Sequence, residues 1–113
     1  MDNEELAFNA WILIGNVLQT LLRGAGANAA TDLDQAELTH LDEALQPIQP
    51  PQMLETLRSL SETQRHLLHE ATKRAFALAG TEAESVLGLT ENDAHPVLAF
   101  LANPGLSLKL LQR

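Results

Sequence analysis

The chain has 113 residues, a formal net charge of −8 and 45% hydrophobic residues, which is typical of one globular domain with its own core. It contains no cysteine, which excludes disulfides, thiolate nucleophiles and cysteine-based zinc sites. The negative charge is concentrated in residues 1–57, with nine acidic residues and one basic residue, whereas residues 58–113 carry six of each. Because this distribution repels polyanions and offers no basic stripe, direct binding to nucleic acid is not expected.

Residue usage predicts an all-α protein. Leucine occurs 23 times and alanine 16 times, whereas valine and isoleucine together occur six times. Helices favour leucine and alanine, and strands favour β-branched and aromatic residues. We therefore expect a single compact all-helical domain over residues 1–113, with six or seven short helices around a central apolar N-terminal helix.

The first predicted helix covers residues 3–23, and apolar side chains occupy more than half of its circumference. That is wider than an ordinary surface helix requires, so either the rest of the domain encloses this helix or a second subunit meets it. Phe8 and Ile12 lie one turn apart on the side away from the inward leucines, and Gly15 beside them permits close approach of another helix. The pattern predicts a homodimer with Phe8 and Ile12 at its interface, because a twofold dimer would bury them.

The same segment bears on the location of the protein. Its most apolar part, residues 6–22, is interrupted by Asn9, Asn16 and Gln19, and is shorter and more polar than a membrane span requires. Acidic residues precede it where a secretory signal carries positive charge, and neither end has a lipidation motif. We therefore predict a cytoplasmic protein that makes no membrane contact.

A loop of small residues is predicted at residues 24–30, after the first helix. Thr31 or Asp32 is expected to cap a second helix over residues 32–45. The inward residues of this second helix are expected to be leucines at helical spacing.

Proline and capping residues then predict two further helices. The prolines within residues 47–51 interrupt the second helix, because each lacks a backbone donor and restricts the residue before it. A third helix is expected over residues 51–60, with a proline in its first turn. Ser61 and Gln64 have the spacing of a capping box for a fourth helix over residues 62–79.

The C-terminal third is predicted to contain short helices. Thr81 and Glu84 form a second candidate capping box, which opens a helix that ends near residue 89. Residues 90–95 are expected to interrupt the helical pattern, and Pro96 is expected to begin a helix over residues 96–102. The tail over residues 103–113 begins with a turn and is interpreted as helical beyond it.

His66, His69 and Glu70 are the best candidates for chemistry. Imidazole and carboxylate groups one helical turn apart can bind zinc or another divalent metal. The order of the residues is neither HExxH nor HxxEH, so the known metalloprotease motifs are absent. On a helical wheel these side chains lie opposite the apolar face and point to water, where local ion pairs explain them better than a metal site does. A metal-dependent enzyme is thus the weakest of three hypotheses, and no cofactor is expected.

The leading hypothesis is a non-enzymatic regulatory or adaptor protein that contacts a protein partner through an apolar helical surface. The rival is an acidic antagonist, of the inhibitor, immunity or nucleic-acid-mimic type, that occupies a basic site on a larger protein. The acidic residues expected to contact a basic partner are Asp32, Asp34, Glu37, Asp42 and Glu43. An apolar interface persists at high salt whereas a charge-mediated one weakens, and the same carboxylates could instead serve solubility alone.

Overall fold

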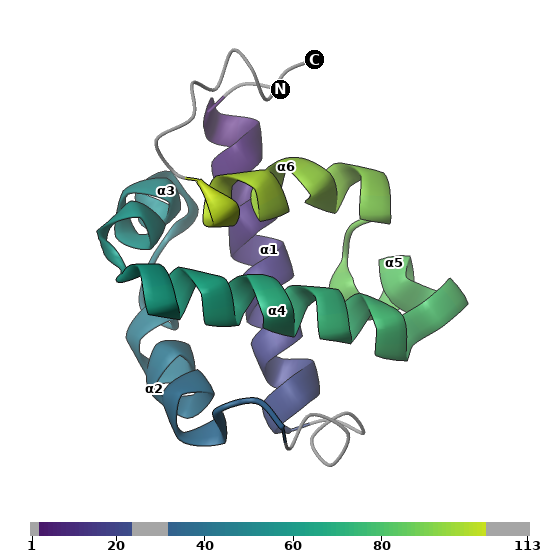
Figure 1. The fold of residues 1–113 in the computed structure, drawn as a ribbon. Coiled ribbons are helices and arrows are strands. Elements are labelled where there is room, and N and C mark those ends of the chain that lie inside the picture. Colours follow the sequence, from purple (N-terminus) through teal and green to yellow (C-terminus); the bar gives the residue numbers. More distant parts are fainter. Residues whose placement is uncertain (1–2, 24–31, 104–113) are drawn as a thin grey trace.

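A computed structural model describes residues 3–23 and 32–103 of the chain, and within them the regular structure is helical (Figure 1). The helices of ten residues or more in this part are α1 (Asn3–Leu22), α2 (Gln35–Leu45), α3 (Pro50–Ser59), α4 (Glu62–Ala79) and α6 (Glu91–Ala102). Between α4 and α6 lie a 3-10 turn (Gly80–Glu82) and α5 (Ala83–Leu87), which has five residues.

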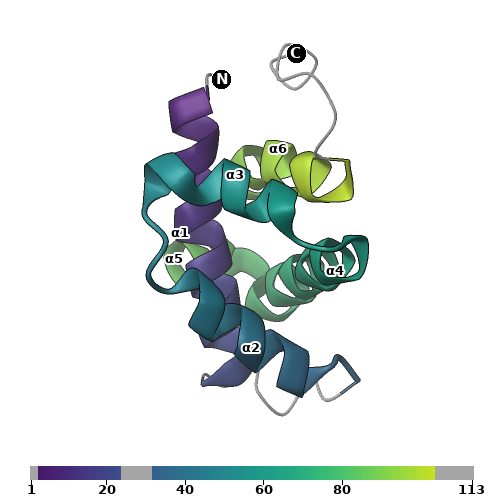
Figure 2. The same ribbon diagram turned by 90° about the vertical axis from the view of Figure 1, so that its left-hand side faces the viewer.

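The N-terminal helix α1 lies at the centre of the domain. Helices α2 to α6 all pack against it, and Figures 1 and 2 show α4 crossing it while α2 and α3 lie to one side and α5 to the other. The prediction of a compact all-α domain around this helix is therefore confirmed. The prediction of six or seven helices is not supported, because the described residues build five helices of ten residues or more, α5 is a single turn, and the tail from residue 104 lies outside them.

The core explains the breadth of the apolar face on α1. Its inward residues are buried, namely Leu6, Ala10, Leu13, Ile14, Val17, Leu18 and Leu21. They pack with buried side chains of the surrounding helices, among them Leu41, Leu57, Leu68 and Phe100. Burying each large apolar side chain contributes on the order of 1.5–3 kcal/mol. Enclosure by the rest of the domain thus accounts for most of the hydropathy of α1.

By length and composition, Glu4–Leu22 is long and apolar enough to cross a membrane, contrary to the expectation from the sequence. In the structure, 44% of the most apolar part of this segment is buried inside the domain. The other helices cover most of the apolar side chains of α1, although Phe8 and Trp11 are exposed, and a core helix can have the same composition as a membrane span.

The start of α4 follows the predicted capping chemistry. The Ser61 Oγ accepts a hydrogen bond from the Gln64 backbone N–H at 3.1 Å, and the Gln64 Oε1 accepts one from the Ser61 backbone N–H at 3.0 Å. These two bonds satisfy donors that the first turn leaves unpaired. Pro50 and Pro51 occupy the first two positions of α3, where a missing donor costs nothing.

Helix α2 begins later than predicted. Its N-cap is Asp34, whose side chain accepts a hydrogen bond from the Glu37 backbone N–H at 3.0 Å. Asp32 does not cap the helix, because its carboxylate is bound to Arg74 on α4. Thr31, the other predicted cap, and the predicted loop over residues 24–30 lie outside the described residues.

The prediction for the segment after α4 is wrong in two places. No side chain caps α5, so the proposed Thr81–Glu84 capping box does not form. Helix α6 begins at Glu91, because the Thr90 side chain caps it by accepting a hydrogen bond from the Asp93 backbone N–H at 3.1 Å. Pro96 therefore lies inside the helix instead of at its start. The hydrogen bond lost there is offset by the core residues that α6 buries on both sides of the proline.

Candidate functional site

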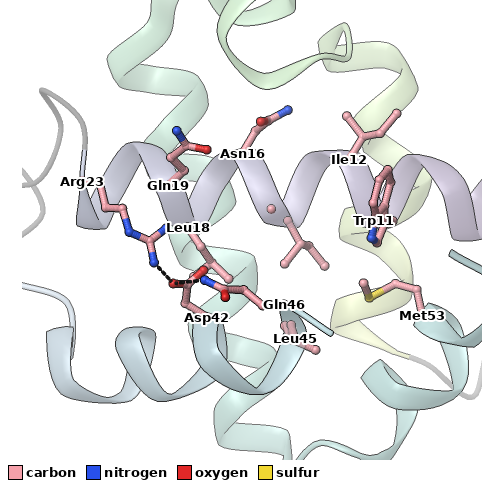
Figure 3. A pocket seen from close by; sticks show the side chains of 12 residues that line it. Trp11, Ile12, Asn16, Leu18, Gln19, Arg23, Asp42, Leu45, Gln46 and Met53 are labelled. Carbon is pink, nitrogen blue, oxygen red and sulfur yellow. Dashed lines mark hydrogen bonds and ion pairs between the residues drawn. The ribbon is translucent and has the colours of Figure 1, made fainter. Parts of the chain in front are cut away.

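A hollow of about 370 Å³ opens over the middle of α1, beside α2 and α3 (Figure 3). Its apolar wall includes Trp11 and Leu18 from α1, Leu45 from α2 and Met53 from α3. Gly15 lies on the exposed side of α1 among these residues, and a Cβ atom added to it would meet nothing within 4 Å. The missing side chain of Gly15 thus leaves space that the surrounding side chains do not fill.

Hydrogen-bonded polar groups close one end of the hollow. Arg23, at the end of α1, donates from Nη2 to Oδ2 of Asp42 on α2, and Gln46 Nε2 donates to the same oxygen at 3.3 Å (Figure 3). The Asp42 side chain is 8% exposed and that of Arg23 is 53% exposed. This ion pair therefore joins two helices, and its buried carboxylate is already occupied.

Two aromatic rings lie exposed at the other end of this surface. Phe8 is 48% exposed and Trp11 is 38% exposed, and their ring centroids are 6.0 Å apart. Trp11 Nε1 donates to the Ile48 carbonyl oxygen at 3.1 Å, which holds the indole against the connection between α2 and α3. The rings form a contiguous apolar patch next to the hollow over Gly15.

The structure places Phe8 and Ile12 differently from one another. Phe8 is exposed, as the helical wheel indicated, but Ile12 is half-buried. The Ile12 Cγ2 atom lies 2.7 Å from where a Cβ on Gly88 would sit, so this side chain is covered by the end of α5. The exposed neighbour of Phe8 is Trp11, whose position on the helical wheel borders the core face and therefore did not predict its exposure.

The five acidic residues predicted to meet a basic partner do not act as one free surface. Asp32 accepts hydrogen bonds from Arg74 Nη1 at 2.7 Å and Nη2 at 2.8 Å, and these bonds lower the pKa of Asp32 to about 2. Asp34 caps α2, and Glu37 Oε1 accepts a hydrogen bond from Gln64 Nε2 at 2.9 Å. These carboxylates hold α2 and the segment before it in place.

Of the remaining two, Asp42 is paired with Arg23 and Glu43 is exposed. Four of the five predicted contact residues therefore have structural partners inside the domain. The sequence gives no sign of the two ion pairs, since Asp42 lies 19 residues from Arg23 and Asp32 lies 42 residues from Arg74. Contact of this set with a basic partner stays a prediction.

His66, His69 and Glu70 line a second hollow, of about 390 Å³, between α4 and the end of α6. His69 Nδ1 lies 4.0 Å from Glu70 Oε1, and the same oxygen lies 3.5 Å from Lys73 Nζ. Partial burial, together with the charge of Lys73, lowers the pKa of His69. His66 is exposed, whereas the His69 side chain is 24% exposed.

This second hollow does not gather a ligand set for a metal. Over residues 3–23 and 32–103, no group of three or more His, Cys, Asp or Glu residues has an arrangement that could hold a metal ion. Adjacent residues such as His69 and Glu70 diverge around a helix, and residues one turn apart need a further ligand from another element to complete a site. The face of α6 that borders this hollow supplies Leu101 and Ala102, which have no ligating atoms in their side chains.

No family model, curated protein or solved structure matches the chain.

Proposed function

We propose that the chain is a non-enzymatic interaction protein that binds a protein partner through the outward side of α1. We call this surface the α1 face and define it by six residues, of which Ile12 is half-buried and the others are exposed: Glu4, Phe8, Trp11, Ile12, Gly15 and Gln19. The observation that carries the proposal is the exposed Phe8–Trp11 pair next to the hollow over Gly15.

The aromatic pair has the properties of an interface anchor. Aromatic side chains are enriched at protein interfaces and supply a large contact area with few rotatable bonds. The indole N–H of Trp11 already donates to the Ile48 carbonyl oxygen, so a partner that covers this ring would not leave a buried donor without a hydrogen bond. Single exposed apolar residues are common on monomers, but two rings in contact beside a hollow make a contiguous patch.

The polar groups of the site also favour a packing surface. Asp42 accepts hydrogen bonds from both Arg23 and Gln46, so its carboxylate is committed to joining α1 and α2. Asn16 lies on the side of α1 opposite to Asp42, and its Nδ2 donates to the Leu87 carbonyl oxygen at 3.0 Å. These bonds fix the helices around the α1 face and hold it as a preformed surface, which lowers the cost of binding.

Photo-crosslinking in the native cell tests this proposal. A photoreactive phenylalanine derivative replaces Phe8 in one variant and Val86 in the control, since Val86 is 41% exposed on α5 and is not one of the residues of the α1 face. We expect a discrete protein adduct from position 8 and none from position 86. Absence of an adduct at position 8, or the same adducts from both positions, would contradict the proposal.

A further inference from the structure

The α1 face carries both an exposed ring, Phe8, and a hollow over Gly15. In an antiparallel pair of α1 helices with a twofold axis between positions 11 and 12, Phe8 lies opposite the partner's Gly15 and Glu4 lies opposite the partner's Gln19. We propose that the partner is a second copy of this chain, bound through antiparallel packing of α1 against α1. This inference rests on the proposed function, since it names the partner of the same surface.

The pairing matches a protrusion with a hollow. Phe8 projects from the face, whereas Gly15 leaves space, and the two residues lie seven positions apart, or about 10 Å along a helix. In the antiparallel dimer each Phe8 enters the hollow over the partner's Gly15, where Leu18 and Leu45 supply apolar walls. Two such contacts form at once, and each fills one of the two hollows.

Charge favours the same direction of packing. The exposed carboxylate of Glu4 lies near the start of α1, and the half-exposed guanidinium of Arg23 lies just beyond its end. In the antiparallel pair Glu4 lies opposite the partner's Gln19, one turn from the partner's Arg23. The Arg23 guanidinium is bonded to Asp42 on one side and half-exposed on the other, so its exposed donors lie near the Glu4 carboxylate at both ends of the pair. The positive N-terminal end of each helix dipole also lies beside the negative C-terminal end of the other.

A parallel pair is less favourable on each of these counts. It would place each Glu4 beside the partner's Glu4 and each Phe8 beside the partner's Phe8. The carboxylates would then repel one another, and both hollows over Gly15 would stay unfilled.

Gly15→Leu is the sharpest test of the packing. Gly15 is exposed in the middle of a helix and its added side chain meets nothing, so leucine is accommodated by the monomer and favours the helix. In the dimer the new side chain occupies the space that Phe8 needs. Sedimentation equilibrium on the full chain is expected to give twice the 12.3 kDa monomer mass for the original protein. For Gly15→Leu the dissociation constant is expected to rise about tenfold or more, which corresponds to about 1.4 kcal/mol. Val86→Asp, the matched surface control, is expected to leave it unchanged.

Disulfide trapping distinguishes antiparallel from parallel packing of the two α1 helices. The chain has no cysteine, so introduced thiols are the only ones present. Glu4→Cys and Gln19→Cys are prepared separately, mixed and oxidised mildly; antiparallel packing yields the mixed disulfide, and neither variant alone yields a covalent dimer. Covalent dimers of each single variant would show parallel packing and overturn the inference.

The outcomes separate this inference from the function on which it rests. A 12.3 kDa monomer at high micromolar concentration overturns the homodimer, as does a dimer that Gly15→Leu leaves intact. If the adduct from position 8 then contains a different protein, the interaction function stands without the homodimer. If position 8 gives no adduct at all, both proposals fall.

Discussion

Gly88→Ala probes the close contact that holds the end of α5 against the side of the α1 face. Gly88 has a φ of +82°, and an added Cβ would lie 2.7 Å from Ile12 Cγ2 and 3.1 Å from Asn16 Nδ2. Asn16 Nδ2 donates to the Leu87 carbonyl oxygen, so displacing this amide also strains a bond that anchors α5. The change therefore combines an unfavourable backbone conformation with a steric overlap.

Both contributions lower the free energy of unfolding. A left-handed conformation costs an alanine roughly 1–2 kcal/mol. Overpacking against a structured side chain costs about 1–3 kcal/mol more. The total, about 2–5 kcal/mol, is a large part of the ~5–15 kcal/mol that stabilises a typical domain. At about 4 °C per kcal/mol for a domain of this size, the melting temperature is expected to fall by roughly 8–20 °C.

A double-mutant cycle isolates the contact, measured by urea unfolding followed by circular dichroism. Ile12→Leu removes the Cγ2 methyl that meets the new Cβ, so Gly88→Ala is expected to cost about 1–2 kcal/mol less in that background. The loss of unfolding free energy that Gly88→Ala still causes in the Ile12→Leu background measures the cost of the left-handed backbone conformation at position 88. The same cost in both backgrounds would refute the inferred contact between Gly88 and Ile12.

Three further outcomes are expected. Arg23→Ala leaves the Asp42 carboxylate buried without its cation and is expected to lower the unfolding free energy by about 1–3 kcal/mol. Lys73→Ala, which breaks an exposed ion pair with Glu70, is expected to cost less than about 1 kcal/mol in the same urea titration. Ser61→Ala removes an acceptor from the capping box of α4 and is expected to cost about 1 kcal/mol by thermal unfolding, and no loss would contradict the role of this cap. His69 is expected to titrate below its ordinary pKa of 6.5 when its ring protons are followed by NMR. Because the unfolded chain binds this proton more readily than the folded chain does, His69 lowers the free energy of unfolding as the pH falls below about 6.5. A His69 titration midpoint at or above 6.5 would contradict the burial of this side chain.

Local sequence signals determined where several helices begin, because their chemistry involves residues close together in the chain. The Ser61–Gln64 capping box predicted the start of α4, and prolines predicted the start of α3. Leucine spacing on α1 predicted a central helix and placed Phe8 on its exposed side. The same local reasoning failed at Pro96, because Thr90 could cap the helix earlier and the core of the domain compensated for the missing donor.

Tertiary structure alone decided which surface residues are available to a partner. Asp32 and Asp42 read as free acids in the sequence, but Arg74 and Arg23, far away in the chain, hold them. Ile12 read as exposed, yet the end of α5 covers it. A helical wheel gives the direction in which a side chain points but not what another segment places in front of it. That depends on how α2 to α6 pack around α1, and long-range packing leaves no periodic signal within any one helix.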